Sequence, residues 1–192
     1  MYKQIFIIII WLLLPTLLAY SEYGYINSFL QSCFLLYWSY IGHVYAHKVS
    51  QLYPINIINT HVSLHHDSIF KSQFPKWVDL FLESINNFMG FYILYIIQYA
   101  FGLNILSSKI ILFSAFLYIG IHIFYYSLTN NKYHAQHHLT PEYNYSPELF
   151  DILFQTRFED GEYDEVSIVG EIVPAFVSYI LVLFIWTFYF DK

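Results

Sequence analysis

The sequence predicts an all-α integral membrane protein: two transmembrane helical hairpins that carry a cytosol-facing histidine-cluster cap, followed by a C-terminal apolar helix. Only 11% of the 192 residues are charged, and 57% are hydrophobic. Soluble domains carry about 25% charged residues, because a surface in water needs them. Five apolar runs, each near the length that crosses a bilayer, alternate with short polar segments. The length fits a single membrane domain over residues 1–192.

The first hairpin is predicted over residues 5–44. Its first run, 5–20, is somewhat short for a membrane helix, which usually needs about 20 residues. A cleaved signal peptide therefore stays open as the alternative for this run. Pro15 would kink a membrane helix without forbidding it. The second run ends at Val44, so the chain returns to the side where it started.

Residues 43–88 are predicted to hold the first two histidine boxes on interfacial helices and loops. Four large apolar residues recur there at helical spacing and predict a helix on the bilayer surface: Trp77, Leu80, Phe81 and Ile85. The second hairpin is predicted over 89–126, with a polar turn at 104–108. This hairpin also returns to the histidine side.

Residues 127–166 hold the third box and an acidic loop, and 168–190 form the C-terminal apolar helix. Most basic residues fall on the histidine side of this topology, which the positive-inside rule assigns to the cytosol. Lys109, in the opposite turn, disagrees with that rule. We expect a protein of the endoplasmic reticulum or an equivalent internal membrane, with its histidine boxes facing the cytosol.

Eight of the nine histidines fall in three boxes, H-x-x-x-H, H-x-x-x-H-H and H-x-x-H-H. Residues three and four apart share one face of a helix, so the imidazoles of a box point at a common spot. Crowded imidazoles cannot all be charged, and neutral ones near lipid need polar partners. A metal ion satisfies several at once. The candidate metal ligands are His43, His47, His61, His65, His66, His122, His134, His137 and His138. Taken alone, His122 fits an ordinary core histidine equally well.

The number of histidines indicates two metal ions, because a tetrahedral zinc takes four ligands. The single cysteine, Cys33, offers no thiolate site and no internal disulfide. Iron in such a site would activate oxygen, whereas zinc would support structure or hydrolysis. We expect two iron ions, with zinc as a further outcome in purified protein, because affinity alone favours zinc over ferrous iron.

The boxes and the segment after them resemble the fatty acid hydroxylase/sterol desaturase superfamily of membrane di-iron enzymes, over roughly residues 42–156. After the first box come Lys48 and the pair Leu52–Tyr53, and after the third box comes Asn-Tyr-Ser-Pro-Glu-Leu-Phe-Asp-Ile-Leu-Phe-Gln-Thr. The superfamily ends in Asn-Tyr followed by Trp-Asp and Phe-Gly-Thr. The matching residues here are Asn144, Tyr145, Asp151, Phe154 and Thr156.

The chain departs from the superfamily pattern at several positions. The second box is H-x-x-x-H-H where the superfamily has H-x-x-H-H, so Val62 stands where a ligand is expected. His122, with Tyr126 four residues later, represents a region where hydroxylases often carry a pair. Phe150 and Gln155 replace the usual Trp and Gly.

The resemblance implies that the protein hydroxylates or desaturates a lipid, such as a fatty acyl chain, a sphingolipid or a sterol, using O2. It implies electrons from a membrane donor such as cytochrome b5 or its reductase, and no catalytic residues beyond the metal ligands. The alternative is a non-catalytic or diverged membrane protein whose histidines bind structural zinc. The net charge of −6 gives no indication of a nucleic-acid partner.

Two carboxylates follow histidine boxes. Asp67 and Asp151 are candidates to orient an imidazole through a hydrogen bond, beside the alternative of a solvated or capping role. The acidic loop, Glu159 to Glu165, lacks the spacing of a calcium loop and is interpreted as a solvated connection.

Overall fold

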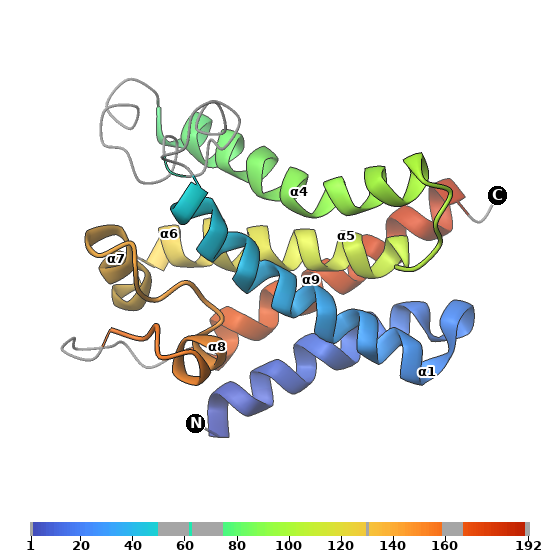
Figure 1. Ribbon diagram of the computed structural model, residues 1–192, viewed down its shortest axis with the longest axis horizontal. Coiled ribbons are helices and arrows are strands. Elements are labelled where there is room, and N and C mark those ends of the chain that lie inside the picture. The colour runs from blue at the N-terminus through green and yellow to red at the C-terminus, as the bar shows by residue number, and fades with distance from the viewer. Residues whose placement is uncertain (1, 50–61, 63–74, 130, 159–166, 191–192) are drawn as a thin grey trace.

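The structure is a computed structural model that describes residues 2–49, 62, 75–129, 131–158 and 167–190. Every regular element in these ranges is a helix, which confirms the predicted all-α class for the described chain (Figure 1). In chain order the elements are α1 (Tyr2–Val49), α4 (Lys76–Ala100), α5 (Ser108–Tyr118), η2 (Ile119–Tyr125), α6 (Tyr126–Thr129), α7 (Lys132–Leu139), α8 (Glu148–Leu153), α9 (Ile168–Ile185) and η3 (Trp186–Phe190).

Four helical stretches are long and apolar enough to cross a membrane: Tyr2–Val49, Trp77–Ala100, Ser108–Tyr125 and Ile168–Phe190. They correspond to the five predicted apolar runs, because the first two runs form the two parts of α1. The membrane class predicted from the composition therefore agrees with the length and composition of the helices.

The helix α1 reverses direction at Gly24, as the blue segment of Figure 1 shows. Gly24 has φ 75° and ψ 161°, a conformation that side chains with a Cβ rarely adopt. The two parts of α1 lie against each other, since the Thr16 and Ser32 hydroxyls are 3.3 Å apart. This reversal lies just after the first predicted run, residues 5–20, and inside the predicted hairpin 5–44.

The helix α4 differs from its prediction. The sequence divides this region into an interfacial helix around Trp77 and a separate apolar run from Met89, but the structure has one continuous helix from Lys76 to Ala100. No proline follows Pro75 within it, and the single Gly90 costs too little to break a helix of this length. The chain then turns at Gly102, where φ is 61°.

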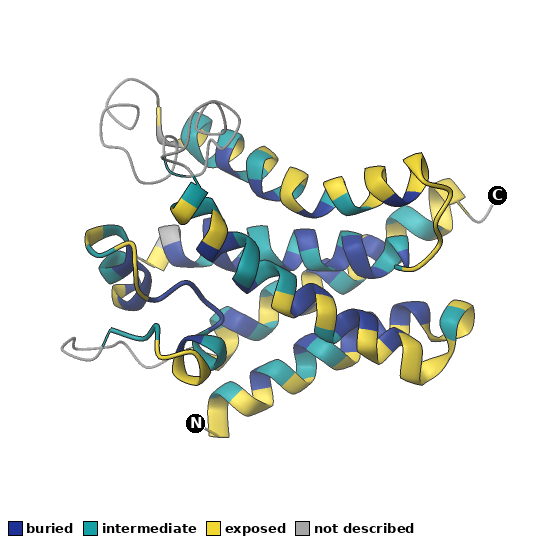
Figure 2. Cartoon of the chain, in the orientation of Figure 1, coloured by how far each residue is buried: buried dark blue, intermediate teal, exposed yellow. Residues whose placement is uncertain are grey.

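The core lies between α1, α5 and α9, while α4 packs on α5 and exposes most of its other face (Figure 2). Ile7, Trp11 and Leu14 of the first run are buried in this core. Their packing supports the membrane-helix alternative for residues 5–20. At Gly120 an added Cβ would lie 2.9 Å from the Cβ of Pro174, so a glycine lets η2 approach α9 closely.

Candidate metal centre

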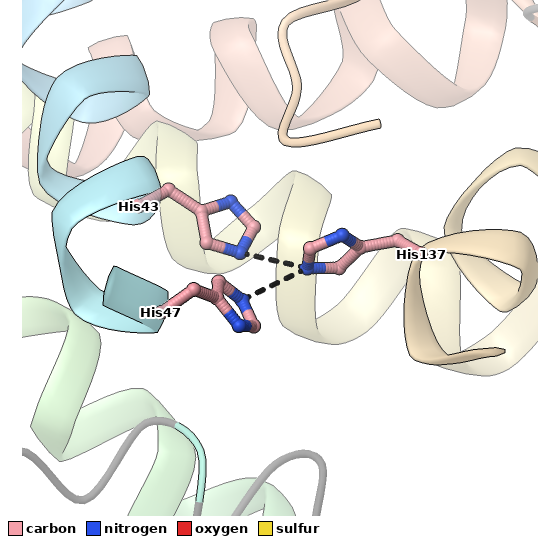
Figure 3. A group of neighbouring side chains, drawn as sticks. All are labelled: His43, His47 and His137. Atoms are coloured by element: carbon pink, nitrogen blue, oxygen red, sulfur yellow. Dashed lines mark hydrogen bonds between the residues drawn. The ribbon is translucent and has the colours of Figure 1, made fainter. Parts of the chain in front are cut away.

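Three histidines from distant parts of the chain meet at one end of the bundle (Figure 3). His43 and His47 lie one turn apart near the end of α1, and His137 lies on α7. Their ligand nitrogens all lie within 4.8 Å of one another. The Nε2 atom of His137 is 3.0 Å from Nε2 of His43 and 3.1 Å from Nε2 of His47. Two imidazoles bound to one ion at about 2.0–2.1 Å place their nitrogens about 3 Å apart, so this spacing fits a shared metal ion.

Backbone carbonyls determine which ring nitrogens of this triad carry hydrogen. His43 Nδ1 donates to the Tyr145 carbonyl oxygen at 2.5 Å, and His137 Nδ1 donates to the Tyr143 carbonyl oxygen at 2.6 Å. A neutral imidazole has one N–H, so both Nε2 atoms direct lone pairs at each other. Two such lone pairs repel unless a cation lies between them. This second hydrogen bond to a carbonyl is also the usual support of a metal-bound histidine.

The charge state of His137 favours a metal ion over a proton. Its side chain is fully buried, and burial lowers the pKa of His137 to about 4. At neutral pH the ring is therefore uncharged, which is the form that binds metals.

A second group of histidines adjoins the triad. His134 and His138 lie one turn apart on α7, with their Nε2 atoms 3.0 Å apart. The ring of His122 lies between the two groups, with its centroid 4.9 Å from that of His43 and 4.5 Å from that of His134. Six of the nine predicted ligands therefore form one continuous cluster.

The spacing of the third box predicts that its three imidazoles point at one spot, but the structure divides them between two groups. His137 faces the α1 histidines, whereas His134 and His138 face each other. Helix geometry explains the division: on an α-helix the fourth residue on is rotated by about 40° and the third by about 60° in the opposite sense. One short helix thus serves two adjacent groups.

His122 lies on the π-helix η2, which follows α5 without a break. π-helical turns are rare and are frequently found at functional sites. The ring of Tyr118 stacks on His122 at 5.0 Å with an angle of 15° between the rings. The π-helical turn thus sets a buried imidazole against the α1 histidines.

Asp151 organises the loop whose carbonyls hold the histidines. Its buried carboxylate accepts hydrogen bonds from four groups: the Tyr145 N–H (3.0 Å), the Ser146 N–H (2.7 Å), the Tyr133 hydroxyl (2.5 Å) and the Thr156 hydroxyl (2.6 Å). Burial raises the pKa of Asp151, although these hydrogen bonds oppose the effect. The sequence predicted a carboxylate that orients an imidazole directly. In the structure it acts through the backbone of Tyr145.

The other tail residues that match the superfamily clamp the same loop. Asn144 has φ 56°, its N–H donates to the Thr156 carbonyl at 2.7 Å, and its Oδ1 accepts from the Phe158 N–H at 2.9 Å. The hydroxyls of Thr156 and Tyr40 lie 2.7 Å apart, which ties the loop to α1. The tail motif is therefore a support for the histidine cluster.

The two substituted tail positions keep their structural setting. Phe150 packs against Tyr40 with ring centroids 5.5 Å apart. Gln155 has φ 57°, in the left-handed region that favours glycine, the residue that the resemblance leads one to expect at this position.

Two cavities reach the histidine cluster. The lateral cavity, of about 380 Å³, lies between α1 and α4 and is lined by His43 at one side. Gly42 and Gly90 also line it, and a Cβ added at either glycine would meet nothing within 4 Å. The inner cavity, of about 40 Å³, lies between α1 and α5 and is lined by His122. Most of the other residues around both are apolar.

Several predicted site residues lie outside the described residues. They are His61, His65 and His66 of the second box, Asp67 after it, and the acidic loop from Glu159 to Glu165.

Sequence reasoning assigned no role to two further residues beside the cluster. Tyr126 stacks on His134 with ring centroids 5.0 Å apart, and its hydroxyl donates to Glu171 Oε1 at 3.2 Å. Glu171 is buried near the start of α9. The signal for it was present in the sequence, because an ionisable residue in an apolar run is rarely incidental.

In comparisons with known proteins, no family model, curated protein or solved structure matches the chain. The resemblance to the hydroxylase superfamily therefore rests on the boxes and the tail motif alone.

Proposed function

We propose that this protein is a membrane-bound di-iron oxidoreductase that hydroxylates or desaturates a lipid with O2. The observation that carries the proposal is the triad of His43, His47 and His137, whose Nε2 atoms converge without a hydrogen between His43 and His137. The adjoining His122, His134 and His138 supply nitrogen ligands for a second ion. An all-imidazole donor set suits iron, and iron supplies the one-electron and oxygen chemistry that imidazoles and tyrosines lack.

The proposed arrangement in the membrane has two helical hairpins, with the histidine cluster at the cytosolic surface of the endoplasmic reticulum or an equivalent membrane. Lys109 is the residue that disagrees with this orientation. Its Nζ atom lies 2.5 Å from a carboxylate oxygen of Glu22. The positive-inside rule weighs the number of Lys and Arg residues on each side, and Lys48, Lys132 and Arg157 on the histidine side outweigh this one lysine.

The lateral cavity supports a lipid substrate. It lies beside α4, whose outward residues, such as Met89 and Ile93, are exposed and apolar. Side chains there would face hydrocarbon in a bilayer, so a lipid chain can approach His43 from within the membrane. Gly42 and Gly90 keep the passage open because neither projects a side chain into it.

The protein's own groups bind, orient and exclude water. The carbonyls of Tyr143 and Tyr145 hold two imidazoles in the ligand tautomer, and the apolar cavity walls keep bulk water from the cluster. Cytochrome b5 or its reductase would deliver electrons at the cytosolic surface.

The test is a comparison of lipids, by mass spectrometry, from cells that express the wild type, His137→Ala or Gly90→Leu. The proposal expects a hydroxylated or desaturated lipid in the wild type and none in His137→Ala. Gly90→Leu should bind metal normally and form much less product, because its side chain fills the lateral cavity. Ser178→Ala on α9, outside these cavities, is the control and should form as much product as the wild type. A substitution at Gly120 is unsuitable as a control, because this glycine packs on Pro174.

Unchanged lipids in wild-type cells supplied with an electron donor would contradict the proposal. If the same protein then held only zinc, the structural-zinc alternative would replace it.

A further inference from the structure

Glu171 is a carboxylate in the apolar core that the metal cluster does not use. Its side chain is 3% exposed, although it lies in a helix apolar enough to cross a membrane. Oε1 accepts the Tyr126 hydroxyl at 3.2 Å, and Oε2 is buried without a hydrogen-bond partner. A buried ionised carboxylate needs a cation or several donors, and this one has a single neutral donor. Such a group is stable when it carries a proton.

A small cavity that several polar side chains line, the Glu171 cavity, lies beside this carboxylate. It measures about 30 Å³ and is lined by Gln4, Glu148, Tyr126 and Ser146 among others. Gln4 Oε1 is a second buried acceptor without a partner there. About 10–15 Å³ of such volume holds one water, which needs two or more polar partners. A water that donates to Gln4 and Glu171 satisfies both orphaned oxygens.

The Glu171 cavity and the inner cavity share one wall. Ser146 lines both, and its hydroxyl lies 3.2 Å from the Tyr126 hydroxyl. Glu171, Tyr126 and Ser146 therefore form a hydrogen-bonded chain from the Glu171 cavity to the cavity lined by His122. At the other end, Glu148 pairs with Arg157 at 3.2 Å, and the Arg157 side chain is 38% exposed. The chain thus runs from near the protein surface to the histidine cluster.

We propose that Glu171 is the proton carrier of an internal proton path, which takes protons from water in the Glu171 cavity and passes them through Tyr126 and Ser146 toward the metal centre. The inference rests on the proposed function for its purpose. Hydroxylation combines O2, a C–H bond, two electrons and two protons into an alcohol and one water. The electrons come from the membrane donor, and the described residues offer the protons this one hydrogen-bonded route from the Glu171 cavity to the inner cavity.

Each group on the path gives up one proton and receives another, so all of them return to their starting protonation state. The relay starts when the Tyr126 O–H turns from Glu171 to Ser146, so that protonated Glu171 donates to the Tyr126 oxygen. Glu171 then gives its proton to Tyr126, Tyr126 gives its own to Ser146, and Ser146 gives one to a water in the inner cavity. Cavity water then returns a proton to Glu171. The titratable groups near Glu171 are Glu148, Tyr125 and Tyr126; the described residues that line the Glu171 cavity include no lysine, arginine or histidine.

The first test is infrared spectroscopy of the purified protein in water and in deuterium oxide. The wild type should show the C=O stretch of a protonated carboxyl group that shifts within minutes in deuterium oxide and is lost in Glu171→Gln. Glu22→Gln is the matched control: it removes a carboxylate that is paired with Lys109, so the band should stay. A band that is absent, that fails to shift, or that survives in Glu171→Gln overturns the proposal.

The second test measures product and hydrogen peroxide per electron supplied, in the wild type, Glu171→Gln and Tyr126→Phe. Positioned proton donors contribute about 100-fold or more, and stray water can replace part of this, so both variants should lose about tenfold or more in product and release more peroxide. Metal content should not change in Glu171→Gln, because its amide still accepts from Tyr126. Equal product and peroxide in all three proteins would overturn the path.

The two failures are distinguishable. A wild type that forms no product, yet shows the exchanging band of Glu171, rejects the oxygenase and retains the proton carrier. A wild type that forms product with an unaffected Glu171→Gln variant rejects the path and retains the oxygenase.

Discussion

The two ends of the helical bundle differ in how their buried polar side chains find hydrogen-bond partners. Each end buries polar side chains where α1, α5 and their neighbours meet. At the end with the Gly24 turn, donors face acceptors at Gln31, Gln98 and Ser107, so the protein itself supplies their partners. At the histidine end, acceptors face acceptors across 3.0 Å.

At the Gly24 end, side chains form hydrogen bonds with backbone N–H groups and with one another. Gln31 Oε1 accepts the Ser107 N–H at 2.7 Å, and the Ser107 hydroxyl donates to Glu22 at 3.2 Å. Gln98 Oε1 accepts the N–H groups of Ile105 and Leu106 at 3.0 and 2.5 Å, so it satisfies the turn between α4 and α5.

This difference in hydrogen bonding between the two ends indicates which end binds a metal ion. Buried polar groups are normally hydrogen-bonded, and Gln31, Gln98 and Ser107 at the Gly24 end follow this rule with partners from the protein itself. The Ser28 hydroxyl is the exception among the described residues there. At the histidine end, a cation between the Nε2 atoms of His43 and His137 would accept both facing lone pairs. Variants at the two ends should therefore differ in kind: one set should change metal binding, and the other should change only stability.

The largest effect is expected at the triad. His137→Ala removes the nitrogen that both α1 histidines approach, and metal affinity should fall by more than about 100-fold, the upper range for the loss of a mere supporting contact. Competition with a chelator of known affinity measures this. Gln136→Ala, on the same helix, is the control, because the Gln136 side chain bonds to Thr140 and contacts none of the histidines in the described structure. Equal affinities would remove His137 from the site.

The next effect is expected at Asp151. Asp151→Asn puts an amide N–H₂ where four donors converge, so the loop that carries the Tyr145 carbonyl should shift and metal affinity should fall about 10- to 100-fold. The same chelator competition measures the change. Tyr133→Phe removes one donor and should give a smaller loss. An Asp151→Asn protein that is destabilised but binds metal as the wild type would show that the tail motif supports only the fold.

A smaller effect, on stability alone, is expected at the Gly24 end. Lys109→Met breaks the ion pair with Glu22 and should lower the free energy of unfolding by about 1 kcal/mol, as is typical of a partly exposed pair. Thermal unfolding in detergent measures the loss. The double variant with Glu22→Gln should recover part of it. Metal affinity should be unchanged in both proteins, and a clear loss of metal would contradict the separation of the two ends.

The smallest effect is expected at Gln155. Gln155→Gly removes the steric cost of a left-handed backbone at φ 57°, which stabilises the folded protein. Glycine is also more flexible in the unfolded chain, which offsets part of this gain, so the free energy of unfolding should rise by up to about 1 kcal/mol. A higher melting temperature with equal metal affinity is the expected outcome. A lower one would mean that the Gln155 side chain contributes contacts worth more than the strain.

Much of the fold could be predicted from the sequence, because apolar runs and polar turns are local signals. The reversal at Gly24 and the helix from Lys132 both follow from such signals. The continuity of α4 through Trp77 could not be predicted in the same way, because a polar composition did not distinguish a loop from the polar first turns of a long helix.

The details of the candidate site depend on packing between distant segments, which spacing does not encode. The sequence placed His137 and His138 in one box, but the position of α7 against α1 divides them between two groups. It indicated that Asp151 orients an imidazole, but it did not indicate that Asp151 acts through the Tyr145 backbone. The role of Glu171 emerges only when α9 brings it to Tyr126.

The measurement that tests the central claim most directly is the metal content per chain of protein purified without oxygen, beside His43→Ala and His137→Ala. The account predicts about two ions per wild-type chain, with iron among them, and a loss of bound metal in each variant while the helical content stays the same. A wild-type protein that is folded and binds no metal, even after addition of ferrous iron or zinc, would contradict it.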